Sequence, residues 1–205
     1  MIYAKHHPLV YSFFKLYTKF KMKGNFNAIK FVGDVDVTNS SVLLVANHIS
    51  WWDGFWALHL SLKFFKKKYH FMMLEPELKK RWLFSYSGGF SIAHGAKSMI
   101  ESLNYCADLL KDRNNLVLMF PQGKLHSMYH DDFRFQKGVE RILEKTPETK
   151  VVFLATLFDY FEHPKPDVYF YMQEFKSENR SSVEIEKEYR AFFKASVERQ
   201  KTITV

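Results

Sequence analysis

One histidine and one aspartate stand five positions apart in the stretch NHISWWD, just after an apolar run that ends at Ala46. A histidine beside a carboxylate can remove a proton from a nucleophile, because the carboxylate fixes the imidazole tautomer and stabilises the imidazolium that forms. The unperturbed pKa of histidine, about 6.5, leaves much of it neutral near physiological pH. In one continuous helix the two side chains would point roughly 140° apart. His48 and Asp53 can therefore pair only if the chain bends between them.

A purely structural role for this aspartate is also open. Ser50 and Asp53 have the spacing of an N-cap residue and the third residue of a helix, so Asp53 would then only cap the helix that follows. The local sequence does not choose between this capping interpretation and the catalytic pair.

Two further segments with polar residues overlap or follow apolar runs: GGFSIAH at 88–94 and FPQGKLHS at 120–127. In α/β proteins, ligands bind outside the carboxyl ends of the strands. If the runs are neighbouring parallel strands, these segments and NHISWWD meet at one edge of the sheet. We therefore expect a single site.

In order and spacing, these segments resemble the lysophosphatidic-acid (glycerolipid) acyltransferase family. NHISWWD matches its first motif, which is Asn-His, four residues, then Asp, and FPQGKLHS is similar to its Phe-Pro-Glu-Gly-Thr-Arg-Ser string. Phe135, Lys137 and Gly138 match its phenylalanine-lysine-glycine element. The resemblance covers roughly residues 30 to 160 and implies an acyltransferase.

The resemblance also implies a mechanism and a set of site residues. His48 would act as general base on an acceptor hydroxyl or amine that attacks an acyl thioester, and Asp53 would orient the imidazole. Acyl-CoA or acyl carrier protein would supply the acyl group to a lipid-like acceptor, with no cofactor and no metal required. The implied substrate-binding residues are Asn47, Gly89, Phe90, His94, Pro121, Gln122, Gly123, Lys124, His126 and Lys137.

Several positions depart from the family pattern. The second motif has an arginine associated with the acceptor phosphate, but here His94 takes its place; Gln122 replaces the glutamate of the third motif, and Leu125 its arginine. The proline of the fourth motif is absent from VVFLAT at 151–156. Histidine and leucine lack the two-pronged guanidinium that binds phosphate. The usual glycerol-phosphate clamp is thus missing.

Two acceptors fit these departures. The acceptor is either a different lipid alcohol or amine without that phosphate, or lysophosphatidic acid held by a rebuilt anion site. The residues available for the rebuilt site are His94, Lys97, Lys124 and His126. We favour the first.

The segment HSMYHDD offers an alternative metal site, from His126, His130, Asp131 and Asp132. A solvated polar loop explains it more simply, so we expect no metal. The single cysteine, Cys106, rules out an intrachain disulfide and a multi-thiolate site, and its helical surroundings predict a buried structural thiol.

The arrangement of apolar runs predicts one α/β domain over residues 1–205, with a mostly parallel central sheet flanked by helices. The catalytic α/β core should span 30–175, followed by a C-terminal helix at 181–203 that begins with the capping-box pair Ser181 and Glu184. The expected strands are 28–33, 41–47, 69–74, a short one within 85–95, 115–120, 150–158 and 167–175. The expected inner helices are 52–65, 76–84, 96–113 and 139–145.

The chain carries a net charge of +8, and no acidic residue precedes Asp34. Residues 1–24 are expected to form an amphipathic helix with an aromatic face and an opposite face that bears Lys15, Lys19 and Lys23, typical of helices that lie on anionic lipid. We expect a peripheral protein on the cytoplasmic face of a membrane and no nucleic-acid partner, with a helix packed on its own domain as the alternative. The aromatic face comprises Leu9, Val10, Phe13, Phe14, Leu16, Tyr17 and Phe20.

Two other functions are compatible with the altered motifs. One is a lipid-binding or acyl-binding protein that keeps the fold without the chemistry. The other is an acyl hydrolase in which His48 activates water.

Overall fold

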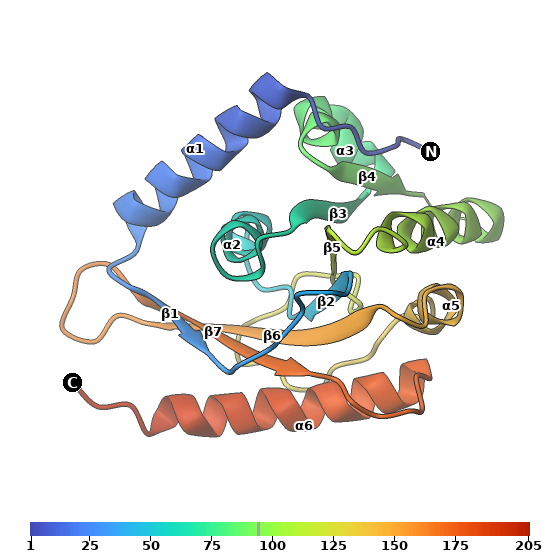
Figure 1. Cartoon of the computed structure of the whole chain (residues 1–205). Coiled ribbons are helices and arrows are strands. Elements are labelled where there is room, and N and C mark those ends of the chain that lie inside the picture. The colour runs from blue at the N-terminus through green and yellow to red at the C-terminus, as the bar shows by residue number, and fades with distance from the viewer. Residues whose placement is uncertain (94) are drawn as a thin grey trace.

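A computed structural model describes residues 1–93 and 95–205. A single seven-stranded sheet runs through the molecule in the order β1-β7-β6-β2-β5-β3-β4 (Figure 1). The strands are β1 (Ile29–Val32), β2 (Val42–Ala46), β3 (Lys68–Leu74), β4 (Gly89–Ile92), β5 (Asn115–Met119), β6 (Lys150–Asp159) and β7 (Asp167–Glu174). The helices are α1 (Pro8–Asn25), α2 (Asp53–Leu60), α3 (Glu75–Lys80), α4 (Ala96–Leu110), α5 (Val139–Lys145) and α6 (Ser182–Lys201). The expected α/β class with a mostly parallel sheet is confirmed.

The five strands β6, β2, β5, β3 and β4 are mutually parallel. Among the described strands, only the β6–β7 pair is antiparallel, and β1 is parallel to β7. The carboxyl ends of β2 and β5 therefore lie side by side. This arrangement brings NHISWWD next to FPQGKLHS, as expected of segments that follow adjacent parallel strands.

Helices cover both faces of the sheet. In β2, Leu43 and Val45 pack into a core shared with α4, α5 and α6, whereas Val42 and Leu44 pack into a core shared with α1 and α2. Every residue of β2 is buried, because successive side chains of a strand point to opposite faces and both faces are covered here. The run VLLVA is continuously apolar for this reason.

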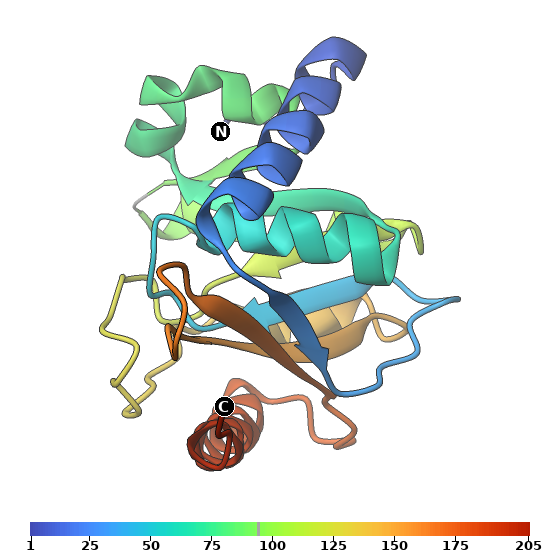
Figure 2. The ribbon, with the colours of Figure 1, turned by 90° about the vertical axis from the view of Figure 1, so that its left-hand side faces the viewer.

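Helix α1 crosses α2 at the edge of the molecule (Figure 2). It begins at Pro8, not near residue 1 as we expected, and residues 1–7 run extended instead. The Lys5 N–H donates to the Ser85 carbonyl, and the carbonyls of Lys5 and Ile2 accept from the N–H groups of Gly88 and Ser91. These bonds to residues on and before β4 replace the ones that a helix would have formed. Among the described residues, no helix has both the length and the apolar character needed to cross a membrane.

The aromatic face of α1 divides into two. Phe14 packs inward, in line with Thr18 and Met22, and these side chains are buried. Leu9, Phe13, Leu16 and Phe20, spaced four, three and four residues apart, remain exposed, with 76%, 57%, 55% and 68% of their surface accessible. The helix thus packs on its own domain and also presents an outward apolar stripe, which we call the α1 stripe.

The other helices differ from the expected boundaries in detail. Helix α2 continues into a π-helical turn, η1 (Ser61–Phe65), and α3 is followed by a 3₁₀ helix, η2 (Trp82–Tyr86). Helix α6 begins as expected, because the Ser181 hydroxyl accepts a hydrogen bond from the Glu184 amide. The Cys106 thiol is fully buried, and burial raises its pKa well above its usual range, as expected of a structural thiol.

Candidate active site

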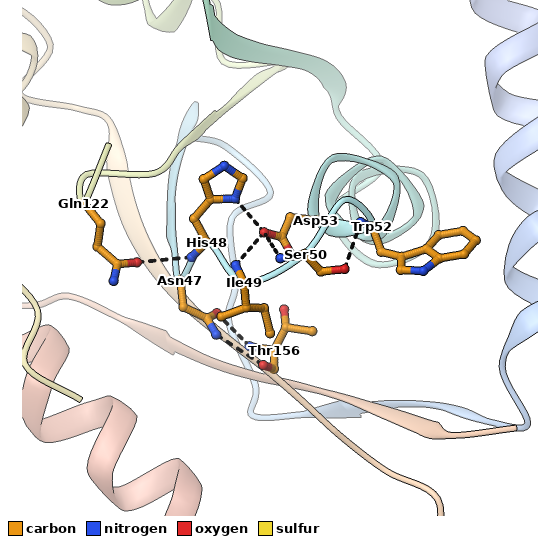
Figure 3. A network of polar contacts seen from close by, with 8 residues as sticks. All are labelled: Asn47, His48, Ile49, Ser50, Trp52, Asp53, Gln122 and Thr156. Carbon is orange, nitrogen blue, oxygen red and sulfur yellow. Dashed lines mark hydrogen bonds and ion pairs between the residues drawn. The ribbon is translucent and has the colours of Figure 1, made fainter. Parts of the chain in front are cut away.

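The chain turns sharply after β2, and Asn47 fixes the start of the turn. Its side-chain amide donates to the Thr156 carbonyl at 3.2 Å and accepts from the Thr156 amide at 3.0 Å (Figure 3). These two bonds imitate one more rung of the β2–β6 ladder. The next residue can then leave the sheet without leaving the buried backbone of β6 unpaired.

The imidazole of His48 meets the carboxylate of Asp53 across this turn. The Nδ1 of His48 lies 2.6 Å from Oδ2 of Asp53, and the same oxygen accepts backbone N–H bonds from Ile49 at 2.8 Å and Ser50 at 3.0 Å. Asp53 is buried, while 27% of the His48 side chain is accessible. The other ring nitrogen points away from the carboxylate (Figure 3). Since this oxygen accepts two backbone N–H bonds, it is placed as an acceptor for Nδ1–H too, and that tautomer of the neutral ring leaves the Nε2 lone pair free.

The capping interpretation of Asp53 is confirmed in part, alongside the pair with His48. Its carboxylate accepts the Ser50 N–H, as in a capping box, and the Ser50 hydroxyl accepts the Trp52 N–H at 3.1 Å. Helix α2 itself begins only at Asp53, with Trp52 at the N-cap position. The second carboxylate oxygen of Asp53, Oδ1, is buried without a hydrogen-bond partner among the described residues.

The loop after β5 holds the backbone of His48 from the other side. The His48 N–H donates to the Gln122 side-chain carbonyl at 3.1 Å, and the His48 carbonyl accepts from the His126 N–H at 2.8 Å. The ring of Phe120 stacks on the imidazole with centroids 4.1 Å apart. The position of the histidine is therefore set by two loops.

A glycine shapes the loop after β5. Gly123 has a φ of 68°, in the left-handed region that glycine adopts without steric cost. The Gln136 N–H donates to the Pro121 carbonyl at 2.8 Å, which draws the segment that contains Lys137 against this turn. As a result, the FPQGKLHS segment and the phenylalanine-lysine-glycine element lie together.

An open cavity of about 720 Å³ begins at His48. This volume is typical of ligand pockets, which span roughly 300–1,000 Å³. Its walls are mostly apolar and come from α2, β3, β4, η2, α4 and the loop after β5. The apolar lining includes Phe14, Trp51, Phe55, Leu58, Phe71, Met72, Met73, Phe84, Ile92, Met99, Leu103 and Leu118, and the charged lining comprises Glu77, Arg81, Lys124 and Lys137.

The structure brings some of the expected site residues to this cavity and not others. His48 lines it together with Pro121, Gln122, Gly123, Lys124 and Lys137. Four of the described residues that were expected to bind substrate are not part of its lining: Asn47, Gly89, Phe90 and His126. Phe90 is fully buried in the core beneath α4, and the Asn47 amide is engaged by Thr156. His94 lies outside the described residues.

The alternative metal site is not assembled. His126 and His130 stack face to face with ring centroids 4.3 Å apart. Within residues 1–93 and 95–205, no three His, Cys, Asp or Glu side chains gather closely enough to hold a metal ion. Asp132 instead forms an ion pair with Arg190 of α6.

Sequence reasoning missed several contributors to the site. The stacking of Phe120 on His48 was not foreseen, although the phenylalanine belongs to the FPQG string. Tyr69 was also missed: its hydroxyl donates to the Gly54 carbonyl in the first turn of α2, and burial raises its pKa well above the usual range. The adjacent residues Met72 and Met73 of β3 also line the cavity.

A comparison with protein families agrees with this geometry. The family model described as Acyltransferase matches residues 25–157, well over half of the 205 residues. The match begins at the end of α1 and ends within β6, so it includes both loops that hold His48. No curated protein matches the chain. The chain belongs to the lysophosphatidic-acid (glycerolipid) acyltransferase family, and the protein is an enzyme that transfers acyl groups.

Proposed function

We propose that this enzyme works at a membrane surface and moves a fatty acyl chain from acyl-CoA or acyl carrier protein to a hydroxyl or amine of a lipid-like acceptor. The observation that carries the proposal is the placement of His48. One ring nitrogen is bound to a buried carboxylate, and the ring lies at the wall of a large apolar cavity. A fatty acyl chain is the kind of substrate that fills such a cavity.

In the proposed reaction, Nε2 of His48 takes the proton of the acceptor hydroxyl or amine while its oxygen or nitrogen attacks the thioester carbonyl carbon. Asp53 stabilises the imidazolium that forms. The tetrahedral intermediate then collapses: the C–S bond breaks, and the leaving thiolate takes the proton from the imidazolium. The products are the acylated acceptor and a free thiol, and no cofactor enters the balance.

The exposed lysines of the cavity suit the donor. Coenzyme A and acyl carrier protein both present the thioester on a phosphopantetheine arm, which is anionic. Lys124 and Lys137 line the cavity beside His48 and are exposed. Neither forms an ion pair with a described carboxylate, so both are available to a phosphate. Arg81, the remaining cation of the lining, is paired with Glu77.

The chemical class of the acceptor follows from the same charged residues of the cavity lining. Of the described residues available for a rebuilt anion site, Lys124 lines the cavity, whereas Lys97 and His126 do not. If Lys124 and Lys137 both serve the donor, no further unpaired lysine or arginine among the described residues lines the cavity to hold a second phosphate. We therefore favour a lipid alcohol or amine without the glycerol phosphate.

Membrane association is proposed from the α1 stripe. Four large apolar side chains in one line, on a helix with four lysines and no acidic residue, match a helix that rests on anionic lipid. Binding to anionic vesicles should weaken as salt screens the lysines. Because Phe14 and Met22 belong to the core, the stripe is tested with Phe13→Ser and Phe20→Ser rather than by deleting the helix. Val183→Ser, at an exposed position of α6, is the matched control.

The chemistry is tested with the purified enzyme, acyl-CoA and a panel of dispersed lipid acceptors with and without a phosphate. Thiol release and acylated product are both measured. His48→Ala should remove acyl transfer while the protein stays folded. Near-normal turnover by folded His48→Ala on the acceptor that works for the wild type would refute the general-base role. Free fatty acid in place of acylated acceptor would identify a hydrolase instead.

A further inference from the structure

A second hollow lies between α1 and the end of α2, away from His48. Its volume is about 310 Å³, and it shares no lining residue with the catalytic cavity. Both walls are helical: one is the middle of α1, and the other is the end of α2 with η1. We call this hollow the α1–α2 groove; its polar lining consists of Ser12, Lys15, Thr18, Lys19, His59 and Lys63.

Thr18 in this groove has an unusual hydroxyl. The residue is 1% exposed, and its Oγ1 is buried without a hydrogen-bond partner among the described residues. A threonine within a helix can donate to the carbonyl four residues earlier, but this one does not. Native proteins rarely leave a buried hydroxyl unpaired, because the desolvated group has lost its bonds to water. A ligand that accepts a hydrogen bond would satisfy it.

The groove is also positively charged without compensation. Lys15, Lys19 and Lys63 form no ion pair with any carboxylate of the described chain, and neither α1 nor η1 contains an acidic residue. The only carboxylate of α2, Asp53, is bound to His48. Burial, and secondly the charge of Lys63, lower the pKa of His59. An anion in the groove would neutralise several of these repulsions at once.

The surface beside the groove shows which anion fits. Leu16 lines the groove and is also a member of the α1 stripe, so charged and apolar surfaces are continuous there. A free phosphate would use only the charged part, whereas a phospholipid would use both. We propose that the α1–α2 groove binds the phosphate headgroup of an anionic bilayer phospholipid, separately from the catalytic cavity. This inference rests on the proposed membrane association but not on the acyl-transfer chemistry.

The site has a consequence for the catalytic cavity. Phe14 precedes Thr18 by four residues on the same face of α1, and Phe14 lines the catalytic cavity. A headgroup held between α1 and η1 therefore fixes the helix that forms one edge of that cavity. Lipid binding would place this edge directly at the bilayer.

The first test measures binding of the full chain to phosphatidylcholine vesicles with and without phosphatidylglycerol. Lys63→Gln should weaken binding to the anionic vesicles about tenfold, since a hydrogen bond to a charged group is lost, and Thr18→Val about fivefold. Lys194→Gln, at an exposed position of α6, removes the same charge elsewhere and should change binding less than about twofold. Equal binding by Lys63→Gln and the wild type would overturn the headgroup site.

The second test follows the His59 imidazole by NMR while a short-chain, soluble phosphatidylglycerol is added. The pKa of His59 should rise, because the bound phosphate stabilises the imidazolium, and Lys63→Gln should need about ten times more lipid. Inorganic phosphate that acts at the same concentration would overturn the lipid assignment. An unchanged His59 titration at saturating lipid would overturn the site.

The two proposals fail in different ways. Loss of vesicle binding in Phe13→Ser, together with unchanged binding in Lys63→Gln and Thr18→Val, would refute the groove but leave membrane association intact. Absence of vesicle binding by the wild type would refute both. Acyl transfer to a detergent-dispersed acceptor is measured in parallel. Lys63→Gln and Thr18→Val should leave it unchanged, because neither residue lines the catalytic cavity.

Discussion

Replacement of Asp53 by asparagine tests the catalytic pair directly. The change keeps an oxygen that can accept the N–H bonds of His48, Ile49 and Ser50 but removes the negative charge. Two unit charges about 4 Å apart interact by about 4 kcal/mol at an effective dielectric constant of about 20. Partial solvent access to His48 reduces this to roughly 3 kcal/mol. At 1.36 kcal/mol per tenfold, kcat/KM should fall by about a hundredfold or more.

The same substitution should also lower stability, which the assay must separate from the catalytic effect. The asparagine amide nitrogen would occupy the place of Oδ1, which is buried without a partner, and two unpaired N–H donors there should cost about 1–3 kcal/mol of unfolding free energy. Thiol release from acyl-CoA is therefore measured below the melting transition of each variant. Asp108→Asn, an exposed substitution of the same type, should leave kcat/KM unchanged. A folded Asp53→Asn enzyme with wild-type kcat/KM would refute the ion-pair mechanism.

Three further predictions follow from other contacts. Gln122→Ala should lower kcat/KM about tenfold because the partly buried backbone N–H of His48 loses its acceptor, whereas Gln122→Glu keeps an acceptor and should retain most activity in the same thiol-release assay. Gly33→Ala should destabilise the protein by several kcal/mol in urea denaturation, since the new Cβ would lie 2.1 Å from the Met172 carbonyl oxygen at a φ of 110°. Burial lowers the pKa of His6 to about 4 and of His70 to about 3. Since the unfolded chain then binds more protons, the urea midpoint should fall as the pH drops from about 6.5 towards 3.

Each of these has its own control. Gly24→Ala, in α1 with no atom near the added Cβ, should stabilise the protein by up to about 1 kcal/mol. Equal effects of Gly33→Ala and Gly24→Ala would contradict the steric argument. His70→Phe should flatten the acid slope of the urea midpoint, and an unchanged slope would assign the acid sensitivity to other groups. Equal activity of Gln122→Ala and Gln122→Glu would exclude a positioning role for that hydrogen bond.

Much of the fold could be predicted because the central strands are buried on both sides. The runs VLLVA in β2 and NLVLM in β5 have no polar face, so their place in the middle of a parallel sheet follows from composition alone. The direction of β7 was harder to predict from the sequence. A seven-residue connection, 160–166, closes a hairpin with β6, and this short link makes the pair antiparallel.

The site was partly predictable for a different reason. His48 and Asp53 lie five positions apart, so a bend between them permits the pair, but the local sequence also fitted a capping role for Asp53. The resemblance to the acyltransferase family favoured the pair. The bond between His48 and Gln122 joins residues 74 positions apart and exists only because β2 pairs with β5 in one register. Periodicity also showed how wide the apolar face of α1 is, but not that Phe14 turns inward while Phe13 stays exposed. Such choices depend on what packs against the helix.

The side chain of Asn47 has one more implication. Because its amide extends the β2–β6 ladder by a rung, the histidine that follows is fastened to the most deeply buried part of the sheet rather than to a loose surface loop. Segments joined in this way exchange their amide hydrogens only when the whole sheet opens. Heating should therefore abolish turnover in step with the cooperative loss of the sheet, with no earlier, separate inactivation of the site.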